Sequence, residues 1–231
     1  WSTEKKLAPD LIITQAQCEA CAVSLNDVKE AVSDWVGNKP DIVSLEPNYL
    51  DEVWSDFEKV GEKLNCTDSY LKFKSEIEQR LEKLQQKSQQ LIKRPSVVCV
   101  EWIDPLMIAA NWVPELVDIA GGINLLTKPG FHSHIFKWEE IIESNPEFII
   151  MMPCGFDINR TLEEIEILKQ KTDWSKLKAV KSNHVFVVDG NQYFNRPGPR
   201  LIESAEILFE IFNFNDKKVK AHENSWIRLE E

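Results

Sequence analysis

Five short apolar runs, spaced along the chain with helical stretches between them, constrain the fold more than any other feature. They occupy residues 11–14, 42–45, 97–100, 148–152 and 185–188. Each run is nearly continuous rather than alternating, a pattern typical of strands buried on both faces of a parallel sheet. Because helical stretches separate the strands, the pattern predicts an α/β architecture. A further helix is expected after the last run, over residues 201–212.

One segment, residues 67–93, breaks this rhythm because it contains neither glycine nor proline. Its apolar residues recur at intervals of seven: Tyr70, Ile77, Leu84 and Leu91. They form one narrow apolar stripe on a helix about 40 Å long, at roughly 1.5 Å per residue. A coiled coil is the alternative, but Arg80 and Lys87 occupy positions that a coiled coil fills with apolar side chains. We therefore interpret the segment as a spine that joins two α/β lobes.

The long helix divides the chain into four parts. Residues 1–66 form an N-terminal lobe, 67–93 the linking helix, 94–215 a C-terminal lobe and 216–231 a polar tail, either docked or frayed. The N-terminal lobe contains only two strand patterns and the chain begins at Trp1 without a methionine, so we expect this lobe to be incomplete.

Charge and motifs exclude several classes of function. The formal net charge of −11 argues against nonspecific nucleic-acid binding, which needs a basic surface, and favours a self-repelling monomer. We find no apolar run of transmembrane length and no signal-peptide pattern in these residues, and since they begin without a methionine this says little about the compartment. Nucleophile-elbow, P-loop and zinc-protease motifs are absent, and no nucleophile accompanies Glu101 and Asp104. We therefore expect no catalysis.

Aromatic and charged residues cluster after the strands, where α/β sheets bind ligands. The candidate ligand contacts are Glu46, Tyr49, Trp102, Asp104, Trp112, Phe156, Tyr193, Phe194 and Arg196. Each aromatic taken alone is better explained by core or rim packing. As a set, they suit a large, flat and partly apolar ligand. Arg196 would bind carboxylate or phosphate groups, and Arg200 either does the same or braces a loop.

The cysteines leave a second interpretation open. Cys18 and Cys21 form a C-x-x-C pair, and Cys154 follows another strand. Together they are a candidate metal or redox cluster, although a zinc site needs four ligands. The alternative is that Cys18 and Cys21 only cover the start of a helix over residues 22–35.

Four stretches of the chain resemble a known family. They are "LAPDLIITQ", "ELVDIAGGINLL", "WEEIIESNPEFIIMMP" and "RPGPRLIESAEILFEI". They resemble the iron-siderophore/cobalamin substrate-binding proteins of ABC transporters, periplasmic binding proteins, with the greatest likeness to vitamin B12-binding members. The resemblance implies two Rossmann-like lobes joined by a long rigid helix, with ligand between the lobes. It also implies that Tyr193, Phe194, Trp102 and Asp104 face that ligand.

The resemblance implies a non-catalytic protein that binds a corrinoid (cobalamin) or another metal chelate, requires no cofactor and delivers its ligand to an ABC permease. It implies a periplasmic or cell-envelope location. Two features depart from the family: Asn195 is neutral where transport-dedicated members carry an acidic docking residue, and the cysteines are atypical. Three alternatives therefore stay open: a cytoplasmic corrinoid-binding protein without a transporter, a metal or redox protein using Cys18, Cys21 and Cys154, and a plain metal-ion binder.

Overall fold

The computed structural model describes residues 9–15, 25–33, 39–214, 221–222 and 224–230. The chain divides into two compact units, Trp1–Glu76 and Ile77–Glu231. The division falls inside the long helix rather than at its ends, so each unit contains about half of that helix.

The N-terminal unit contains the two strands predicted for it. Strands β1 (Leu11–Gln15) and β2 (Asp41–Leu45) pair in parallel, with Leu11 opposite Asp41 and Gln15 opposite Leu45. Helix α2 (Leu25–Ser33) lies between them in the sequence, and helix α3 (Leu50–Lys63) follows β2. This strand–helix–strand order confirms the α/β prediction for this part of the chain.

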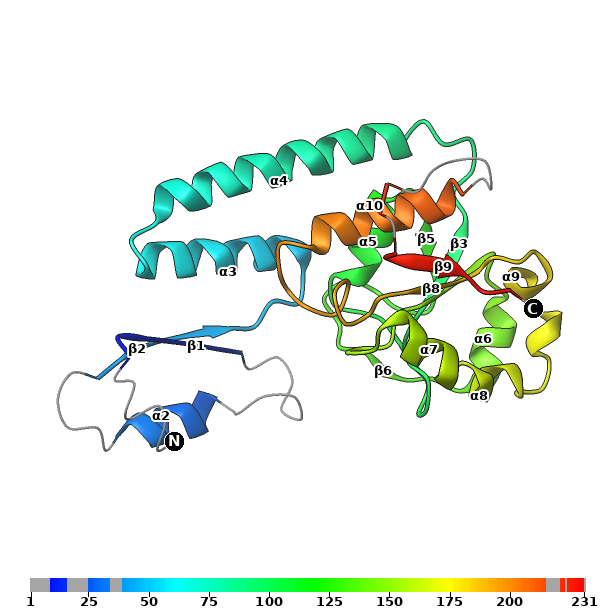
Figure 1. Cartoon of the computed structure of the whole chain (residues 1–231), viewed down its shortest axis with the longest axis horizontal. Helices are drawn as coiled ribbons and strands as arrows, with labels where there is room; N and C mark the ends of the chain where they lie inside the picture. Colours follow the sequence, from blue (N-terminus) through cyan, green and yellow to red (C-terminus); the bar gives the residue numbers. More distant parts are fainter. Residues whose placement is uncertain (1–8, 16–24, 34–38, 215–220, 223, 231) are drawn as a thin grey trace. The chain divides into compact units, whose positions relative to one another are not determined.

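Helix α3 and the first half of helix α4 (Thr67–Ser88) form a helical hairpin (Figure 1). Aromatic side chains fill the space between them, with ring centroids 5.1 Å apart for Phe57 and Phe73 and 6.3 Å apart for Trp54 and Phe73. The helices approach closely at Gly61, where an added Cβ would lie 3.1 Å from Cβ of Tyr70. The hairpin therefore buries one side of α4 within this unit.

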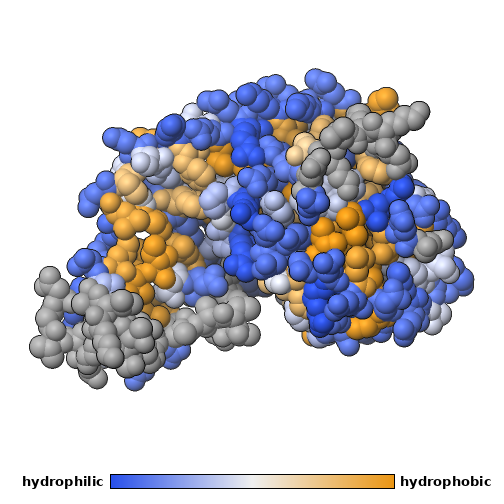
Figure 2. All heavy atoms as spheres, in the orientation of Figure 1, coloured by the Kyte–Doolittle hydropathy of each residue, from blue (hydrophilic) through white to orange (hydrophobic). Residues whose placement is uncertain are grey.

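Helix α4 has the narrow apolar stripe predicted from the heptad spacing. Tyr70, Ile77 and Leu84 are each 5–6% exposed, and hydrophilic residues cover the opposite side (Figure 2). The helix ends at Ser88 rather than at Lys93, because the chain tightens there into i→i+3 turns: the N–H of Gln90 donates to the carbonyl of Lys87, and the N–H of Leu91 donates to that of Ser88. No helix within the described ranges is both long and apolar enough to cross a membrane.

The C-terminal unit is built on a mixed sheet with strand order β6-β4-β3-β7-β8-β9, and β5 also pairs with β3. Its centre consists of β3 (Ser96–Trp102), β7 (Phe148–Met151) and β8 (Val185–Val188), which are parallel and match the three predicted strands. The short strands β4 (Met107–Ile108), β5 (Ile123–Asn124) and β6 (His134–Ile135) were not predicted. At two residues each, they are too short to show a hydrophobic period.

Helices cover both faces of this sheet (Figure 1). Alternate residues such as Val98, Ile149 and Val187 pack in one core cluster, which includes residues of α6 (Trp138–Ser144), α8 (Glu166–Lys169) and α9 (Lys178–Lys181). Helices α5 (Val113–Ile119) and α10 (Leu201–Phe212) pack together, and α10 has the bounds predicted for it. Two covered faces explain why the central strands are continuously apolar.

The predicted polar tail contains a strand of the sheet. Strand β9 (Trp226–Arg228) pairs antiparallel with β8, and Trp226 lies opposite Val188. The Trp226 side chain is 1% exposed and contacts the rings of Phe186 and Phe214 at 5.5 and 5.4 Å. Of the two alternatives, the segment is therefore docked rather than frayed, because burial of one large aromatic side chain is enough to dock a segment that is otherwise polar.

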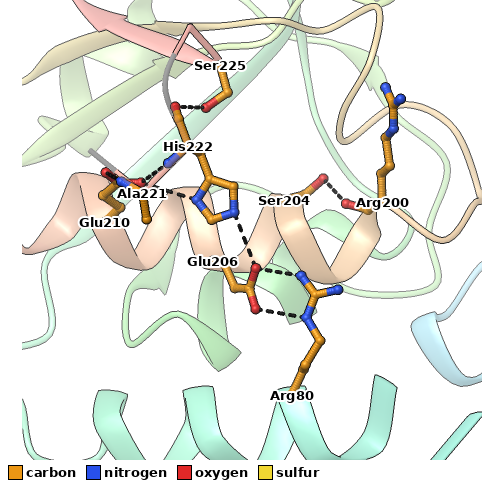
Figure 3. Close-up of polar contacts among 8 residues, drawn as sticks. All are labelled: Arg80, Arg200, Ser204, Glu206, Glu210, Ala221, His222 and Ser225. Carbon is orange, nitrogen blue, oxygen red and sulfur yellow. Dashed lines mark hydrogen bonds and ion pairs between the residues drawn. The ribbon is translucent and has the colours of Figure 1, made fainter. Parts of the chain in front are cut away.

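A cluster of charged residues holds the approach to β9 against α10 and α4 (Figure 3). Arg80 on α4 donates from Nε and Nη2 to the two carboxylate oxygens of Glu206 on α10, at 3.1 and 2.7 Å. The ring of His222 lies between two carboxylates, with Nε2 3.3 Å from Glu206 and Nδ1 3.2 Å from Glu210. Both ring nitrogens need a proton to donate to both carboxylates, so the geometry suits the imidazolium form.

We expect this cluster to make stability depend on pH in both directions. The hydrogen bond to Glu206 raises the pKa of His222 from 6.5, so its stabilisation is complete below about pH 6.5 and is lost as pH rises through the raised value. Burial alone would raise the pKa of Glu206, but hydrogen bonds from His222 and Arg80 outweigh it and lower the pKa to about 2. The stabilisation by Glu206 is therefore complete above about pH 4.5 and is lost on acidification.

Urea denaturation of the wild type and of His222→Gln between pH 5 and 8 checks this expectation. The difference in unfolding free energy should be at most about 1 kcal/mol near pH 5.5, as for an ion pair partly in contact with solvent, and should shrink toward pH 8. A difference that stays constant across this range would contradict a charged His222 in the cluster.

Candidate ligand-binding surface

The carboxyl ends of β3, β7 and β8 meet on one edge of the C-terminal sheet because the three strands are parallel. Backbone hydrogen bonds connect the loops that follow them. The N–H of Cys154 donates to the carbonyl of Glu101 at 3.0 Å, and the N–H of Asn191 donates to the carbonyl of Phe156 at 2.9 Å. The three strand ends therefore form one continuous surface, the strand-end surface, which the sequence predicted as a ligand edge.

The loop after β8 is held in place by Asn195 and by a close approach at Gly190. Nδ2 of Asn195 donates to the carbonyls of Met152 and Gly190, at 2.8 and 3.0 Å. An added Cβ on Gly190 would lie 2.2 Å from the carbonyl oxygen of Pro153. Asn195 stands where the resemblance places a permease-docking residue, but its side-chain amide donates hydrogen bonds to the backbone of this unit.

Two aromatic rings and an arginine form one part of the strand-end surface. The rings of Trp102 and Phe156 lie 5.2 Å apart and are tilted by 55°. The guanidinium of Arg160 lies 5.3 Å from the centre of the Phe156 ring, and Nε1 of Trp102 donates to the backbone carbonyl of the exposed Asp104. The structure thus brings together Trp102, Phe156 and Asp104 as predicted, and adds Arg160.

Tyr193 and two arginines form the neighbouring part. The guanidinium of Arg200 lies 5.8 Å from the centre of the Tyr193 ring and donates to Oε1 of Gln192. Arg196 is exposed and donates to Oδ1 of Asn191 at 3.0 Å. Burial, followed by the charge of Glu203, raises the pKa of Tyr193, so its hydroxyl remains a hydrogen-bond donor at neutral pH. Both arginines are exposed and each donates one hydrogen bond within this loop, so each keeps further N–H groups for solvent or a ligand.

Two of the predicted contacts lie in the core instead. Phe194 is fully buried and Trp112 is 3% exposed. Nε1 of Trp112 donates to the carbonyl of Phe194, and the hydroxyl of Ser204 accepts the N–H of Phe194. Phe194 also has a φ of 67°, which turns its side chain inward while Tyr193 stays on the surface. The prediction that these two residues face a ligand is therefore corrected.

Glu101 and Cys154 lie next to these aromatic residues. Burial raises the pKa of Glu101, and the hydroxyl of Ser133 donates a short hydrogen bond to its carboxylate. Burial, together with the charge of Glu101, raises the pKa of the exposed Cys154 thiol. A raised pKa disfavours the thiolate that binds metals.

The other two cysteines of the predicted metal cluster, Cys18 and Cys21, lie outside the described residues. Within the described part of the chain, no three histidine, cysteine or acidic side chains are grouped closely enough to hold a metal ion.

The N-terminal unit has a pocket of about 280 Å³ at the carboxyl end of β2, which we call the acceptor pocket. It is lined by Ser44, Glu46, Pro47, Glu52, Ser55, Asp56 and Lys59. The predicted contact Glu46 is in this lining, and Tyr49, 41% exposed, begins the turn into α3. Glu52 and Asp56 were not predicted, because they lie on α3 and the sequence analysis considered only residues that directly follow strands.

A family model described as "Periplasmic binding protein" matches residues 5–191. The sequence is 23% identical over 168 residues to the high-affinity heme uptake system protein IsdE of Staphylococcus aureus (strain MRSA252). This alignment covers 69% of the chain and 56% of IsdE, so the chain spans little more than half the length of that relative.

Solved structures show the same fold. The crystal structure of IsdE complexed with heme superposes with a TM-score of 0.75 at 19% identity, covering 91% of this chain and 80% of IsdE. An ABC transporter substrate-binding protein from Listeria monocytogenes superposes with a TM-score of 0.77 at 17% identity, covering 91% of this chain and 79% of that protein. The periplasmic vitamin B12-binding protein BtuF of Vibrio cholerae superposes with a TM-score of 0.62 at 19% identity, covering 94% of this chain and 79% of BtuF. Because the family model matches most of this chain, the chain belongs to the periplasmic binding protein family.

Proposed function

We propose that this chain belongs to a substrate-binding protein of an ABC import system, and that it binds a flat metal chelate of the tetrapyrrole class without chemical change. The observation that carries the proposal is the strand-end surface, where Trp102, Phe156 and Tyr193 stand beside exposed arginine. Flat rings suit the face of a macrocycle, and arginine suits its polar edge groups. Two relatives support this class, since IsdE was solved in complex with heme and BtuF is named as a vitamin B12-binding protein.

The chelate is cargo rather than a cofactor in this proposal. The protein would work outside the cytoplasmic membrane, as the names of the periplasmic relatives suggest, and would pass its ligand to a permease. Burial raises the pKa of the Cys154 thiol, which disfavours its nucleophilic thiolate form. Selective, reversible binding is therefore the activity to measure.

Titration of the full-length protein with heme and with cyanocobalamin, followed by absorbance, tests the proposal. We expect binding of at least one of them at micromolar or lower concentration. Trp102→Ala and Tyr193→Ala should each weaken it about tenfold to a hundredfold, because each removes roughly 1.5–3 kcal/mol of aromatic contact.

Ile123→Ala is the matched control. Ile123 is 47% exposed and pairs with the first residue of β3, at the end of the sheet opposite the strand-end surface. Its truncation should leave affinity unchanged. Failure of the wild type to bind either chelate would overturn the proposal.

A further inference from the structure

Another pocket of the C-terminal unit lies at the amino ends of β3, β7 and β8, away from the strand-end surface. Its volume is about 240 Å³, several times the roughly 30 Å³ that one water occupies in the liquid. We call it the lysine pocket, and it is lined by Lys93, Pro95, Glu147, Phe148, Lys178, Ser182, His184 and Phe212. All of these residues belong to one compact unit, so the pocket is complete within it.

Two ammonium groups share one carboxylate in the lysine pocket. Nζ of Lys93 and Nζ of Lys178 both donate to Oε1 of Glu147, at 2.6 Å for Lys178. The other oxygen, Oε2, accepts the backbone N–H of Ser96 at 3.1 Å. The hydrogen bonds from Lys178 and Lys93 lower the pKa of Glu147 to about 2, so this carboxyl group is ionised at neutral pH. Two positive charges against one negative charge leave the pocket positive, on a chain whose formal net charge is −11.

The lysines keep donors for a ligand. An ammonium group has three N–H groups, and each lysine gives one of them to Glu147. The side chains of Lys93 and Lys178 are 71% and 52% exposed, so the remaining N–H groups are accessible from solvent. Because both ammonium groups contact the same oxygen, they lie close together and repel each other. A second carboxylate would accept hydrogen bonds from both and would balance the excess charge.

The rest of the lining is flat and apolar. The imidazole ring of His184 lies on the ring of Phe148, with centroids 4.4 Å apart and planes within 16°. The Phe212 ring meets Phe148 edge-on at 5.7 Å. Burial lowers the pKa of His184, so its ring is neutral at pH 7 and adds no charge to the pocket. A flat ring of a ligand can therefore pack against aromatic side chains while its charged group contacts the lysines.

We propose that the lysine pocket binds a small organic carboxylate that carries a flat apolar ring. The pocket and the strand-end surface lie at opposite ends of the same parallel strands, so this inference does not depend on the proposed function. The net positive charge disfavours a metal cation. A neutral apolar molecule would cover the lysine N–H groups without giving them acceptors.

Three probes separate the contribution of the charge from that of the ring. The full-length protein is titrated with benzoate, acetate and benzyl alcohol while the ring-proton signals of His184, identified with His184→Gln, are followed by NMR. We expect benzoate to shift these signals with saturation at millimolar concentration. Acetate, which lacks the ring, and benzyl alcohol, which lacks the charge, should each bind about tenfold more weakly. The affinity for benzoate should fall as salt is raised.

Charge variants of the pocket should have effects of opposite sign. Lys93→Gln and Lys178→Gln should each weaken benzoate binding severalfold, because each removes one ammonium group. Glu147→Gln should strengthen it severalfold, because it removes the competing charge and keeps an oxygen for the N–H of Ser96. Both lysines are exposed, so their variants should fold even if Glu147→Gln is unstable.

Lys128→Gln is the matched control. It makes the same charge change at an exposed position between β5 and β6, outside the pocket lining, and should leave benzoate binding unchanged. A loss in Lys128→Gln as large as in Lys178→Gln would overturn the inference. So would the absence of a saturable shift of the His184 signals, or equal affinities for benzoate and acetate. None of these outcomes bears on the strand-end surface, which is tested with heme and cyanocobalamin.

Discussion

Gly190→Ala should destabilise the chain by about 3 kcal/mol or more and abolish chelate binding. The added Cβ would lie 2.2 Å from the carbonyl oxygen of Pro153 and 2.9 Å from the carbonyl carbon of Met152. Both contacts are to backbone, which cannot move aside as a flexible side chain can, so the cost should reach or exceed the usual range for overpacking. The contact joins the ends of β7 and β8, and relieving it would separate the two halves of the strand-end surface. Urea denaturation and ligand titration measure both effects.

Gly198→Ala is the matched control in the same loop. The nearest atom to its added Cβ is 3.9 Å away, so there is room for a methyl group. The substitution should change stability by no more than about 1 kcal/mol, and in the stabilising direction, because alanine restricts the unfolded chain. If both variants were equally stable, the close approach at Gly190 would not exist in solution.

Trp226→Ala should lower the free energy of unfolding by about 3–5 kcal/mol, the usual cost of removing a fully buried aromatic side chain. The side chain is 1% exposed and packs against Phe186, a residue in the central strand β8. Its loss would free β9 from the edge of the sheet as well as leave a cavity. Chemical denaturation followed by circular dichroism measures the loss, and hydrogen exchange at Val187 and Val188 should rise.

Phe131→Ala provides the comparison for this variant. Phe131 lies in the same unit but is 63% exposed, so its truncation should cost less than about 0.5 kcal/mol. A loss below about 1 kcal/mol in Trp226→Ala would mean that the segment is frayed, the other possibility that the sequence left open.

Local pattern was sufficient for the framework of the fold. The continuous apolar runs located all three central strands of the C-terminal unit, because burial on two faces leaves a signal that does not depend on distant residues. They also located β1 and β2, although the expected burial on both faces is not found there, since both strands are only partly buried. Local pattern also located α10, whose bounds match the prediction, and the stripe on α4. The end of α4 was misplaced because the last turn tightens into i→i+3 hydrogen bonds, an effect too local for periodicity to register.

The candidate surface was predicted only in outline. Strand order alone implied that residues after β3, β7 and β8 share an edge, and Trp102, Phe156 and Tyr193 do so. Strand order could not distinguish Tyr193 from its neighbour Phe194, because the backbone turn at Phe194, with a φ of 67°, decides which ring points inward. Aromatic residues carry the same hydrophobic signal in either place.

The sequence by itself therefore determined the class of fold, the family and which strand ends share one edge of the sheet. Only the tertiary structure decided that β9 completes the sheet, that Trp112 and Phe194 belong to the core, and that Glu52 and Asp56 join Glu46 around one pocket. The physical reason is the range of the interactions. Strands and helices follow from periodic burial along the chain, whereas a pocket depends on which side chains from separate elements meet and on which polar atoms remain without partners.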